Sequence, residues 1–300
     1  MKVLELFGGI GACTKALKRI GINYEIVDYV EIDEYAVKSF NAIHGTNFKP
    51  QDITKWNKQI NVDLIMHGSP CQDFSKEGRN AGGNKNSGTR SSLMYESIRI
   101  INNLKPKFVI WENVKNLISK THKHNFDNYI NLLEDYNSYY QVLNACDYGI
   151  PQKRERVFVI SIRKDIDNNS FKFPEKIELK TKLADLLEKE VDEKYYLSDE
   201  QINKLKVNSD LQRLLLRNAT SKGYIEAFEN DSIDLMHPTS KTRRGRVKKD
   251  ISHTLSCRAN IGVAVGSSVL LTFPKTPKSR IIYNLARTLT TGVNQGVIVK

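Results

Sequence analysis

The chain alternates short apolar runs with amphipathic helical segments from Lys2 to Ile162, and this alternation constrains the fold more than any other feature. Continuous apolar runs are typical of buried strands, and a helix between two of them lets the chain return to the same edge of a sheet. The pattern predicts a doubly wound α/β sheet. The expected strands are 2–7, 24–30, 62–66, 108–111, 140–145 and 156–162, with a short strand before Gln51, and the expected helices are 12–20, 34–43, 94–104 and 126–136.

Positive charge is concentrated in the last fifth of the chain. Residues 240–300 contain twelve Lys and Arg but one acidic residue, Asp250, so they carry +11 of the net +12. A basic block beside a near-neutral domain is typical of nucleic-acid binding, because phosphate contacts release counterions. The pattern changes after Phe173, which predicts two domains, 1–172 and 173–300.

Composition excludes several classes of protein. The 40% apolar content is sufficient for substantial cores, and no apolar run is long enough to span a bilayer. The cysteines show no zinc-ligand spacing, so we expect reduced thiols in the cytoplasm and no metal. These cysteines are Cys13, Cys71, Cys146 and Cys257.

The stretch 62–74, VDLIMHGSPCQDF, places a cysteine directly after a buried strand. Gly68 ends the apolar run, and Pro70 fixes its own φ and restrains Ser69, which makes the turn stiff. In open α/β sheets ligands bind outside the carboxyl ends of the strands, so Cys71 is a candidate nucleophile. The alternative is a small buried hydrophobic residue.

The first expected strand ends in a glycine turn, GGIG at residues 8–11. Such a turn lets a ligand approach the backbone next to a helix N-terminus. Thr14 stands at the third glycine position of the dinucleotide fingerprint, so a nicotinamide-dependent oxidoreductase is the weaker alternative. Glu31 follows the second strand, where a carboxylate accepts hydrogen bonds from ribose hydroxyls.

A second carboxylate, Glu112, follows the strand 108–111. The carboxyl ends of parallel strands share one edge, so the glycine turn, Glu31, Cys71 and Glu112 should face one rim. Residues 73–92 are small and polar, and a loop of that length inside a compact domain is usually functional or disordered. Beside a candidate nucleophile, we interpret this loop as a lid.

Five segments resemble, in order and spacing, the motifs of DNA cytosine-5 methyltransferases. They are LELFGGIGA (4–12), DIT (52–54), GSPCQDFS (68–75), ENV (112–114) and YGIPQKRERVFVI (148–160). Each motif alone is weak or moderate, whereas the ordered set is highly specific. The resemblance implies a Rossmann-like methyltransferase sheet, S-adenosylmethionine as cofactor and double-stranded DNA as partner.

The resemblance also implies roles for particular residues. The cofactor would be held by Phe7, Gly8, Gly9, Gly11, Glu31, Ile32, Asp52, Ile53 and Pro70, with Glu31 at the ribose and Asp52 and Ile53 at the adenine. The catalytic set would be Cys71, Glu112, Arg154 and Arg156. Related enzymes often place an aromatic residue at the position of Ile32, which predicts looser stacking on the adenine.

The chemistry explains these residue types. C5 of cytosine is a poor nucleophile, so a thiolate from Cys71 must first add to C6. A thiol of pKa ~8.5 needs nearby positive charge to ionise, and Arg156 and the cofactor's sulfonium are candidates. Glu112 would hold or share a proton at N3 while Cys71 adds. These atoms are inaccessible inside a duplex, so the base must be flipped out.

Residues 173–300 occupy the position of the family's smaller, mainly β target-recognition domain. A capping-box pattern at 198–201 predicts a helix through Lys206, and two similar phrases, DISHTLSCRANIGVAV and NLARTLTTGVNQGVIV, predict hairpins. In the family such turns contact bases in the major groove. We expect DNA contacts from Arg243, Arg244, Arg246, Arg258 and Arg287.

Family members normally continue with a helical segment and a GNS-type motif, and neither follows the second hairpin before Lys300. A split enzyme completed by a second polypeptide, a fragment, and a phage-like variant are the open explanations. A DNA-binding module without activity and an RNA cytosine-5 methyltransferase are the competing functions. We expect a monomer unless a second polypeptide completes it. It would be nucleoid-associated in the cytoplasm of a prokaryotic or phage-infected cell and serve restriction-modification or phage protection.

Overall fold

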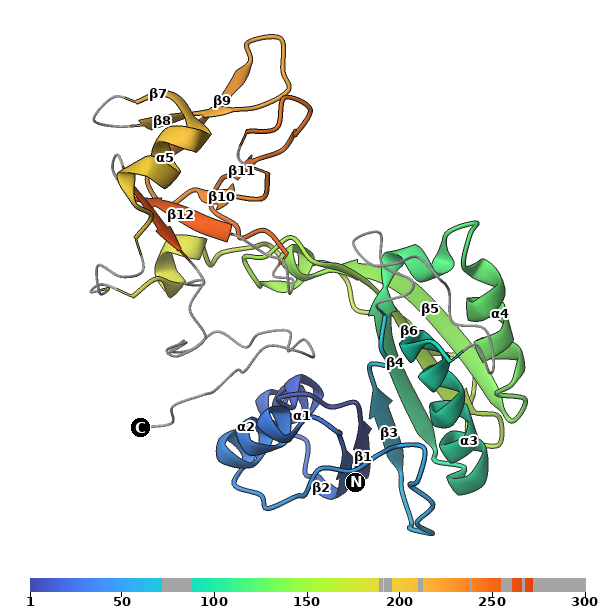
Figure 1. The fold of residues 1–300 in the computed structure, drawn as a ribbon. Helices are drawn as coiled ribbons and strands as arrows, with labels where there is room; N and C mark the ends of the chain where they lie inside the picture. The colour runs from blue at the N-terminus through green and yellow to red at the C-terminus, as the bar shows by residue number, and fades with distance from the viewer. Residues whose placement is uncertain are drawn as a thin grey trace. The chain divides into compact units, whose positions relative to one another are not determined.

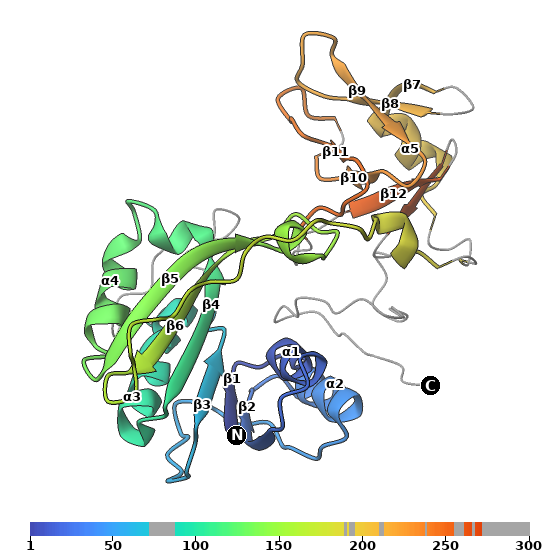
Figure 2. The same cartoon turned by 180° about the vertical axis from the view of Figure 1, so that it is seen from behind.

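The computed structural model describes residues 1–71, 88–188, 191, 196–209, 213–237, 239–254, 261–265 and 268–271, which form two compact units (Figure 1; Figure 2). The first unit comprises residues 1–143 and 155–175, and the second comprises 144–154 and the described residues from 176 onward. The sequence predicted a boundary after residue 172 and placed 144–154 in the first domain. The structure assigns this short segment to the second unit.

The first unit is built on a sheet whose described strands lie in the order β2-β1-β3-β4-β6-β5. Strands β1 to β4 are parallel, and β6 is antiparallel to β4. Their bounds are β1 Lys2–Leu6, β2 Glu25–Val30, β3 Leu64–His67, β4 Phe108–Val114, β5 Tyr136–Asn144 and β6 Glu155–Arg163. The predicted doubly wound α/β sheet is confirmed. The short strand expected before Gln51 was wrong, because residues 46–50 form no strand.

Helices cover both faces of this sheet (Figure 1). Successive side chains of a strand point to opposite faces, so Val3 packs with Leu17 of α1 while Leu4 joins the cluster that contains Ile98 of α3. The helices are α1 Ala12–Arg19, α2 Glu34–His44, α3 Met94–Leu104 and α4 Lys123–Asn131, with short 3₁₀ helices η1 Arg90–Leu93 and η2 Lys115–Ile118. Helix α4 ends earlier than predicted, because Tyr136 begins β5.

Local sequence sets the ends of the second helix. The Asp33 side chain caps α2 by accepting hydrogen bonds from the backbone N–H groups of Tyr35 and Ala36. Gly45, with φ 68°, ends the helix in the left-handed conformation that glycine adopts without strain. The Asp33 cap fixes where α2 begins, directly after Glu31 and Ile32.

The second unit contains, in its described part, two small sheets with orders β11-β10-β12-β13 and β7-β8-β9. A buried apolar cluster that includes Leu214, Ile233 and Ala264 draws on both sheets. The elements are η3 Ala145–Tyr148, η4 Leu183–Leu186, α5 Asp199–Leu205, β7 Lys206–Ser209, β8 Arg213–Arg217, β9 Tyr224–Phe228, β10 Ser232–Asp234, β11 Val247–Lys248, β12 Ile261–Val265 and β13 Ser268–Leu271. The strands agree with the mainly β domain predicted here.

The predicted capping box is present. The Ser198 N–H donates to Gln201 Oε1 at 3.1 Å, and the Gln201 N–H donates to Ser198 Oγ at 3.4 Å. The return strand of the first predicted hairpin is β12, which pairs with β10 and β13. Most of the first strand of that hairpin, and the whole second hairpin, lie outside the described residues.

Candidate active site

The carboxyl ends of β1, β2, β3 and β4 meet at one edge of the six-stranded sheet. We call this edge the rim and define it by residues 7–11, 31–33, 68–71 and 112–114. Because β6 is antiparallel to β4 and Arg156 pairs with Val114, the start of β6 also lies at the rim. Sheet topology therefore brings the predicted cofactor turn and the predicted catalytic residues Cys71, Glu112 and Arg156 to one edge.

A glycine turn forms the first part of the rim. Gly9 has φ 55° and Gly11 has φ 80°, values that glycine adopts at little cost. A Cβ built on Gly8 would lie 2.7 Å from Tyr29 Cε2, so no larger residue fits there without movement. The Tyr29 hydroxyl donates to the Gly9 carbonyl at 2.6 Å. The turn is thus held against β2, and its backbone carries no side chain at Gly8 and Gly9.

Glu31 connects β2 to this turn. Its carboxylate accepts hydrogen bonds from the backbone N–H of Gly9 at 3.3 Å and from those of Ile32 and Asp33 at 2.9 and 3.0 Å. Burial raises the pKa of Glu31, and these backbone hydrogen bonds oppose that increase. The neighbouring Ile32 is 65% exposed.

Asp52 and Ile53 lie close to the end of β2. The Gln51 N–H donates to the Glu31 carbonyl at 2.8 Å and so joins this segment to the rim. Asp52 Oδ1 accepts from the Thr54 hydroxyl and N–H, and these hydrogen bonds lower the pKa of Asp52. Ile53 is buried, and its carbonyl accepts hydrogen bonds from the Trp56 N–H at 3.2 Å and from Arg99 Nη2 at 3.1 Å.

These residues fit S-adenosylmethionine. The carboxylate of Glu31 suits ribose hydroxyls, and the exposed face of Ile32 suits the flat adenine ring. The bare backbone at Gly8 and Gly9 permits the close approach that a large cofactor needs. Phe7, Gly11, Asp52, Ile53 and Pro70 lie in the same loops or next to them.

Two side chains of β4 hold the turn between β3 and Cys71 by hydrogen bonds to Ser69. Ser69 is buried, and its hydroxyl accepts a hydrogen bond from Trp111 Nε1 at 3.1 Å. Asn113 Nδ2 donates to the Ser69 carbonyl at 3.2 Å. The half-buried Cys71 therefore follows a turn that two buried side chains hold in place.

Glu112 lies beside the start of the same turn. A Cβ built on Gly68 would be 3.7 Å from Glu112 Oε2, and Arg156 Nε lies 3.0 Å from Glu112 Oε1. The side chains of Arg156 and Glu112 are only 16% and 29% exposed. The sequence offered Arg156 as a cation for the thiol, but the structure places its guanidinium on the Glu112 carboxylate.

Cys13 shows why a thiol near the rim is not automatically a nucleophile. Burial raises the pKa of Cys13 strongly, and the nearby charges of Glu5 and Glu112 raise it further. Glu5 is 1% exposed, and its carboxylate accepts a hydrogen bond from the Thr14 hydroxyl. Burial raises the pKa of Glu5 to about 7.

Sequence reasoning missed several supporting residues, namely Glu5, Tyr29, Ser69, Trp111 and Asn113. Glu5, Ser69 and Asn113 stand inside motifs that were quoted for their neighbours, and polar residues inside buried strands or turns were the available signal. His67 is a further case, because its ring accepts or donates one hydrogen bond with the Tyr129 hydroxyl at 2.8 Å. Burial lowers the pKa of His67 to about 3, so it is neutral.

The remaining predictions concern Arg154, the lid, and a metal site or membrane span. Arg154 belongs to the second unit, where its backbone N–H donates to Asn144 Oδ1 at 2.9 Å and its carbonyl accepts from Ala145. Residues 73–87 of the predicted lid lie outside the described residues, whereas the end of that segment begins η1. In the part of the chain that the structure describes, no cluster of three potential metal ligands occurs and no helix is long and apolar enough to cross a membrane.

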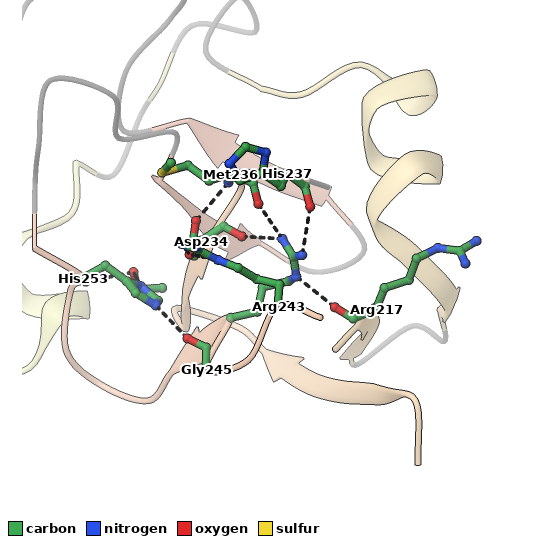
Figure 3. Close-up of polar contacts among 9 residues, drawn as sticks. Arg217, Asp234, Met236, His237, Arg243, Gly245 and His253 are labelled. Atoms are coloured by element: carbon green, nitrogen blue, oxygen red, sulfur yellow. Dashed lines mark hydrogen bonds and ion pairs between the residues drawn. The ribbon is translucent and has the colours of Figure 1, made fainter. Parts of the chain in front are cut away.

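The predicted DNA-contact residues have different environments. Arg244 is exposed, and Arg246 is fully buried among backbone carbonyls of the second unit. Arg243 is paired with Asp234 (Figure 3). A guanidinium with no exposed surface cannot reach a phosphate, so the expected DNA contact of Arg246 is corrected. Arg258 and Arg287 lie outside the described residues.

Comparison with protein families matches residues 1–292 to the family of C-5 cytosine-specific DNA methylases. The chain belongs to this family. The resemblance predicted from the sequence motifs is confirmed, and the match to the family extends over both units of the chain. Family members in general use S-adenosylmethionine, which agrees with the fit at Glu31 and Ile32.

Relatives include bacterial and phage methyltransferases. The type II methyltransferase M2.ScrFI of Lactococcus lactis subsp. cremoris is 35% identical over 260 residues, covering 68% of this chain and 72% of the relative. The orphan methyltransferase M.SPRI of Bacillus phage SPR is 36% identical over 243 residues, covering 68% and 54%. Type II methyltransferase M.HhaI of Haemophilus parahaemolyticus is 38% identical over 192 residues, covering 62% and 57%. The matched region is thus little more than half of two of these relatives.

Solved structures support the fold. A DNMT2 variant from Spodoptera frugiperda aligns with a TM-score of 0.57 at 24% identity, covering 68% of this chain and 65% of the other. The methyltransferase EhMeth from Entamoeba histolytica aligns with a TM-score of 0.55 at 19% identity, covering 69% and 66%. At these identities the likeness concerns the architecture of the sheet and its helices.

Proposed function

We propose that this family member is a sequence-specific DNA cytosine-5 methyltransferase that transfers a methyl group from S-adenosylmethionine to C5 of cytosine. The observation that carries the proposal is the position of the Glu112 carboxylate beside Gly68. Gly68 begins the turn that leads to Cys71, and hydrogen bonds from Trp111 and Asn113 to Ser69 hold this turn in place. The glycine turn and Glu31 stand at the same rim. A thiol, a carboxyl and a cofactor site at one sheet edge are what the chemistry requires.

In the proposed reaction, the Cys71 thiolate forms a bond to C6 while Glu112 holds or shares a proton at N3. The electron pair displaced from the C5–C6 double bond makes C5 nucleophilic. S-adenosylmethionine supplies the electrophilic methyl group. The new C5–methyl bond forms as the methyl–sulfur bond breaks. A base then takes the C5 proton, and its electron pair expels Cys71.

The ion pair of Glu112 with Arg156 has a role in this scheme. It fixes the Glu112 carboxyl in one orientation, so that this carboxyl holds or shares the proton at N3 of the cytosine in a defined position. Arg154, which the family motif places near the base, would contact the substrate or adjacent backbone. The target cytosine must leave the duplex to reach this site, at a cost of a few kcal/mol.

The relatives support a role in DNA modification. Those reported above are named as type II or orphan phage methyltransferases, which favours a restriction-modification or phage protection system for this chain. A second polypeptide is a further partner in the proposal, and the experiment below tests it directly.

The experiment is transfer of labelled methyl groups from S-adenosylmethionine to duplex DNA by residues 1–300, with and without the polypeptide encoded immediately downstream. We expect incorporation at C5 of cytosine, which Cys71→Ser abolishes. Cys146→Ser is the matched control, because a serine hydroxyl retains the hydrogen bond to the Gln152 carbonyl. Transfer to tRNA but not to DNA, or unchanged transfer by Cys71→Ser, would overturn the proposal.

A further inference from the structure

The loop between β10 and β11 carries three arginines whose environments differ. We call residues 235–237 and 239–246 the clamped loop. Arg244 is exposed, Arg243 is half-buried and Arg246 is fully buried, although all three stand within one short run of sequence. The same side-chain chemistry therefore serves different purposes at neighbouring positions.

Arg246 closes the loop from inside. Its Nε donates to the Arg217 carbonyl at 2.8 Å, its Nη1 to the carbonyls of Asp234 and Met236 at 2.8 and 3.3 Å, and its Nη2 to the His237 carbonyl at 3.1 Å (Figure 3). A guanidinium offers five donors in a rigid fork, so one side chain can satisfy several buried carbonyls. This binds the first residues of the loop to its last residue and to the end of β8.

Arg243 supports the loop from its outer side. Its Nε donates to Asp234 Oδ2 at 2.9 Å, and its Nη2 contacts the same oxygen. The Arg243 carbonyl accepts from the Ala219 N–H at 2.7 Å, and the Arg246 carbonyl accepts from the Asp234 N–H at 2.7 Å. The charge of Arg243 is therefore used within the protein, and the backbone on both sides of Arg244 is fixed.

Arg244 and Lys241 remain available. Both side chains are exposed, and neither forms an ion pair with any residue that the structure describes. Between them and the start of the loop, the Ser240 N–H donates to the His237 carbonyl at 3.0 Å and orders the chain. The clamped loop thus presents two cations on a backbone that is held by these hydrogen bonds.

We propose that Arg244 and Lys241 contact the phosphate backbone of duplex DNA, and that Arg243 and Arg246 are positioning residues that hold these two cations in place. The inference rests on the proposed function, because it takes DNA as the partner. Arginine and lysine are the usual phosphate contacts, and a loop that is ordered before binding loses less conformational entropy when it binds.

The test compares neighbouring arginines whose replacement should affect the salt dependence of DNA binding and the thermal stability differently. The affinity of the full chain for a labelled duplex of mixed sequence is measured across a salt series for wild type, Arg244→Ala, Arg243→Ala and Arg19→Ala. Arg19 is an exposed arginine at the C-terminal end of α1, at the opposite edge of the sheet from the rim, and serves as the matched control. Thermal unfolding of each variant is recorded alongside.

We expect Arg244→Ala to weaken DNA binding roughly tenfold at low salt, to reduce the slope of log Kd against log salt by about 0.9, and to leave thermal stability unchanged. Arg243→Ala should lower thermal stability and weaken binding while the salt slope stays unchanged. Equal slopes for Arg244→Ala and Arg19→Ala, or a reduced slope for Arg243→Ala, would overturn the inference.

Labelled methyl transfer by the same preparations separates this inference from the proposed function. If wild type methylates DNA and Arg244→Ala behaves like Arg19→Ala, the loop inference fails and the function stands. If no preparation methylates DNA but Arg244→Ala still reduces the salt slope, the function fails and the loop inference stands. Tighter binding of a double-stranded RNA with the same dependence on Arg244 would overturn the choice of DNA as the partner.

Discussion

At the scale of single residues, Glu112 and Arg156 form an ion pair that is largely screened from water. With side-chain exposures of 29% and 16%, this pair is more secluded than the neighbouring pair of Lys115, at the start of η2, with Glu155 of β6, whose exposures are 56% and 43%. Ion pairs exposed to solvent contribute about 0–1 kcal/mol, whereas removing one partner of a buried pair leaves an unbalanced charge. The two pairs therefore offer a controlled comparison.

We predict that Arg156→Gln lowers kcat for methyl transfer roughly a hundredfold, because the Glu112 carboxyl loses the group that orients it. Lys115→Gln should change kcat less than about twofold, since it removes only a surface pair. Steady-state methyl transfer at saturating DNA and S-adenosylmethionine measures both. Equal rates for the two variants would contradict the role given to Arg156.

Glu5 is a second residue whose environment decides its chemistry. Burial raises the pKa of Glu5 to about 7, compared with about 4.3 in an unfolded chain. The unfolded chain therefore releases this proton at lower pH than the folded protein does. The stabilising contribution of protonated Glu5 is complete below about pH 4.3 and is lost as pH rises to about 7.

We predict that Glu5→Gln becomes progressively more stable than wild type between about pH 4.3 and about pH 7, reaching a difference of roughly 2–3 kcal/mol. Glutamine keeps a hydrogen-bonding group beside the Thr14 hydroxyl and cannot ionise. Chemical denaturation of both proteins at several pH values gives the difference directly. The low pKa of His67 also makes stability depend on pH, but it contributes equally in wild type and in Glu5→Gln, so it does not affect the difference between them. A constant difference across this range would show that Glu5 does not titrate there.

At the scale of elements, the turn that bears Cys71 depends on β4. Asn113 is 1% exposed and donates to both the carbonyl and the hydroxyl of Ser69, at 3.2 and 3.3 Å. Trp111 supplies a further hydrogen bond to that hydroxyl. Two consecutive inward-facing positions of one strand thus set the geometry of the turn that follows the neighbouring strand.

Asn113→Ala should lower kcat by roughly ten- to a hundredfold with little change in KM for DNA, because Cys71 is displaced without loss of a substrate contact. The free energy of unfolding should fall by about 1–3 kcal/mol, since a buried carbonyl loses its donor. Asn128→Ala, on the exposed face of α4, is the control and should leave both quantities unchanged. A fall in stability with unchanged kcat would assign Asn113 a purely structural role.

The clamped loop permits a prediction on stability. Arg246→Lys keeps the positive charge but replaces a fork of five donors by a single ammonium, which cannot reach four carbonyls together. We predict a loss of about 2–4 kcal/mol in the free energy of unfolding. Arg244→Lys should cost less than about 0.5 kcal/mol. Denaturant unfolding of the two variants measures the contrast, and equal losses would contradict the clamp.

The elements show what sequence can and cannot reveal. The parallel strands and their helices could be predicted, because buried strands read as apolar runs and α2 carries a cap at Asp33. The short strand expected before Gln51 was wrong, because residues 46–50 form no strand. The segment is instead held to β2 by the Gln51 side chain, which donates to Asp28 Oδ1 and to the Tyr29 carbonyl. Arg246 was misjudged because burial of an arginine depends on carbonyls brought from distant positions.

At the scale of the whole molecule, the chain forms two units that are each made of more than one continuous segment. Residues 144–154 leave the sheet after β5, join the second unit and return to begin β6. Periodicity cannot detect such an excursion, because the segment is short and lies between two strands that do belong to the sheet. The ordered motifs nevertheless identified the family, since their spacing survives the excursion.

The net positive charge of the molecule is concentrated in the second unit, beyond residue 240. The basic excess beyond residue 240 predicted a nucleic-acid partner, and the structure adds that individual arginines in this region are used internally. Net charge therefore overstates the number of groups available to phosphate. The side chains that remain exposed, such as Arg244, are those to which the affinity for DNA is assigned.

The central claim is that Cys71 attacks C6 of a cytosine before the methyl group arrives. Fluorine at C5 cannot leave as a proton does, so a duplex containing 5-fluorocytosine should trap the enzyme after transfer. The account predicts a protein–DNA adduct that survives denaturation, carries the labelled methyl group, maps to Cys71 and is absent in Cys71→Ser. Methylation of ordinary duplex DNA without any such adduct, or an adduct at another residue, would contradict it.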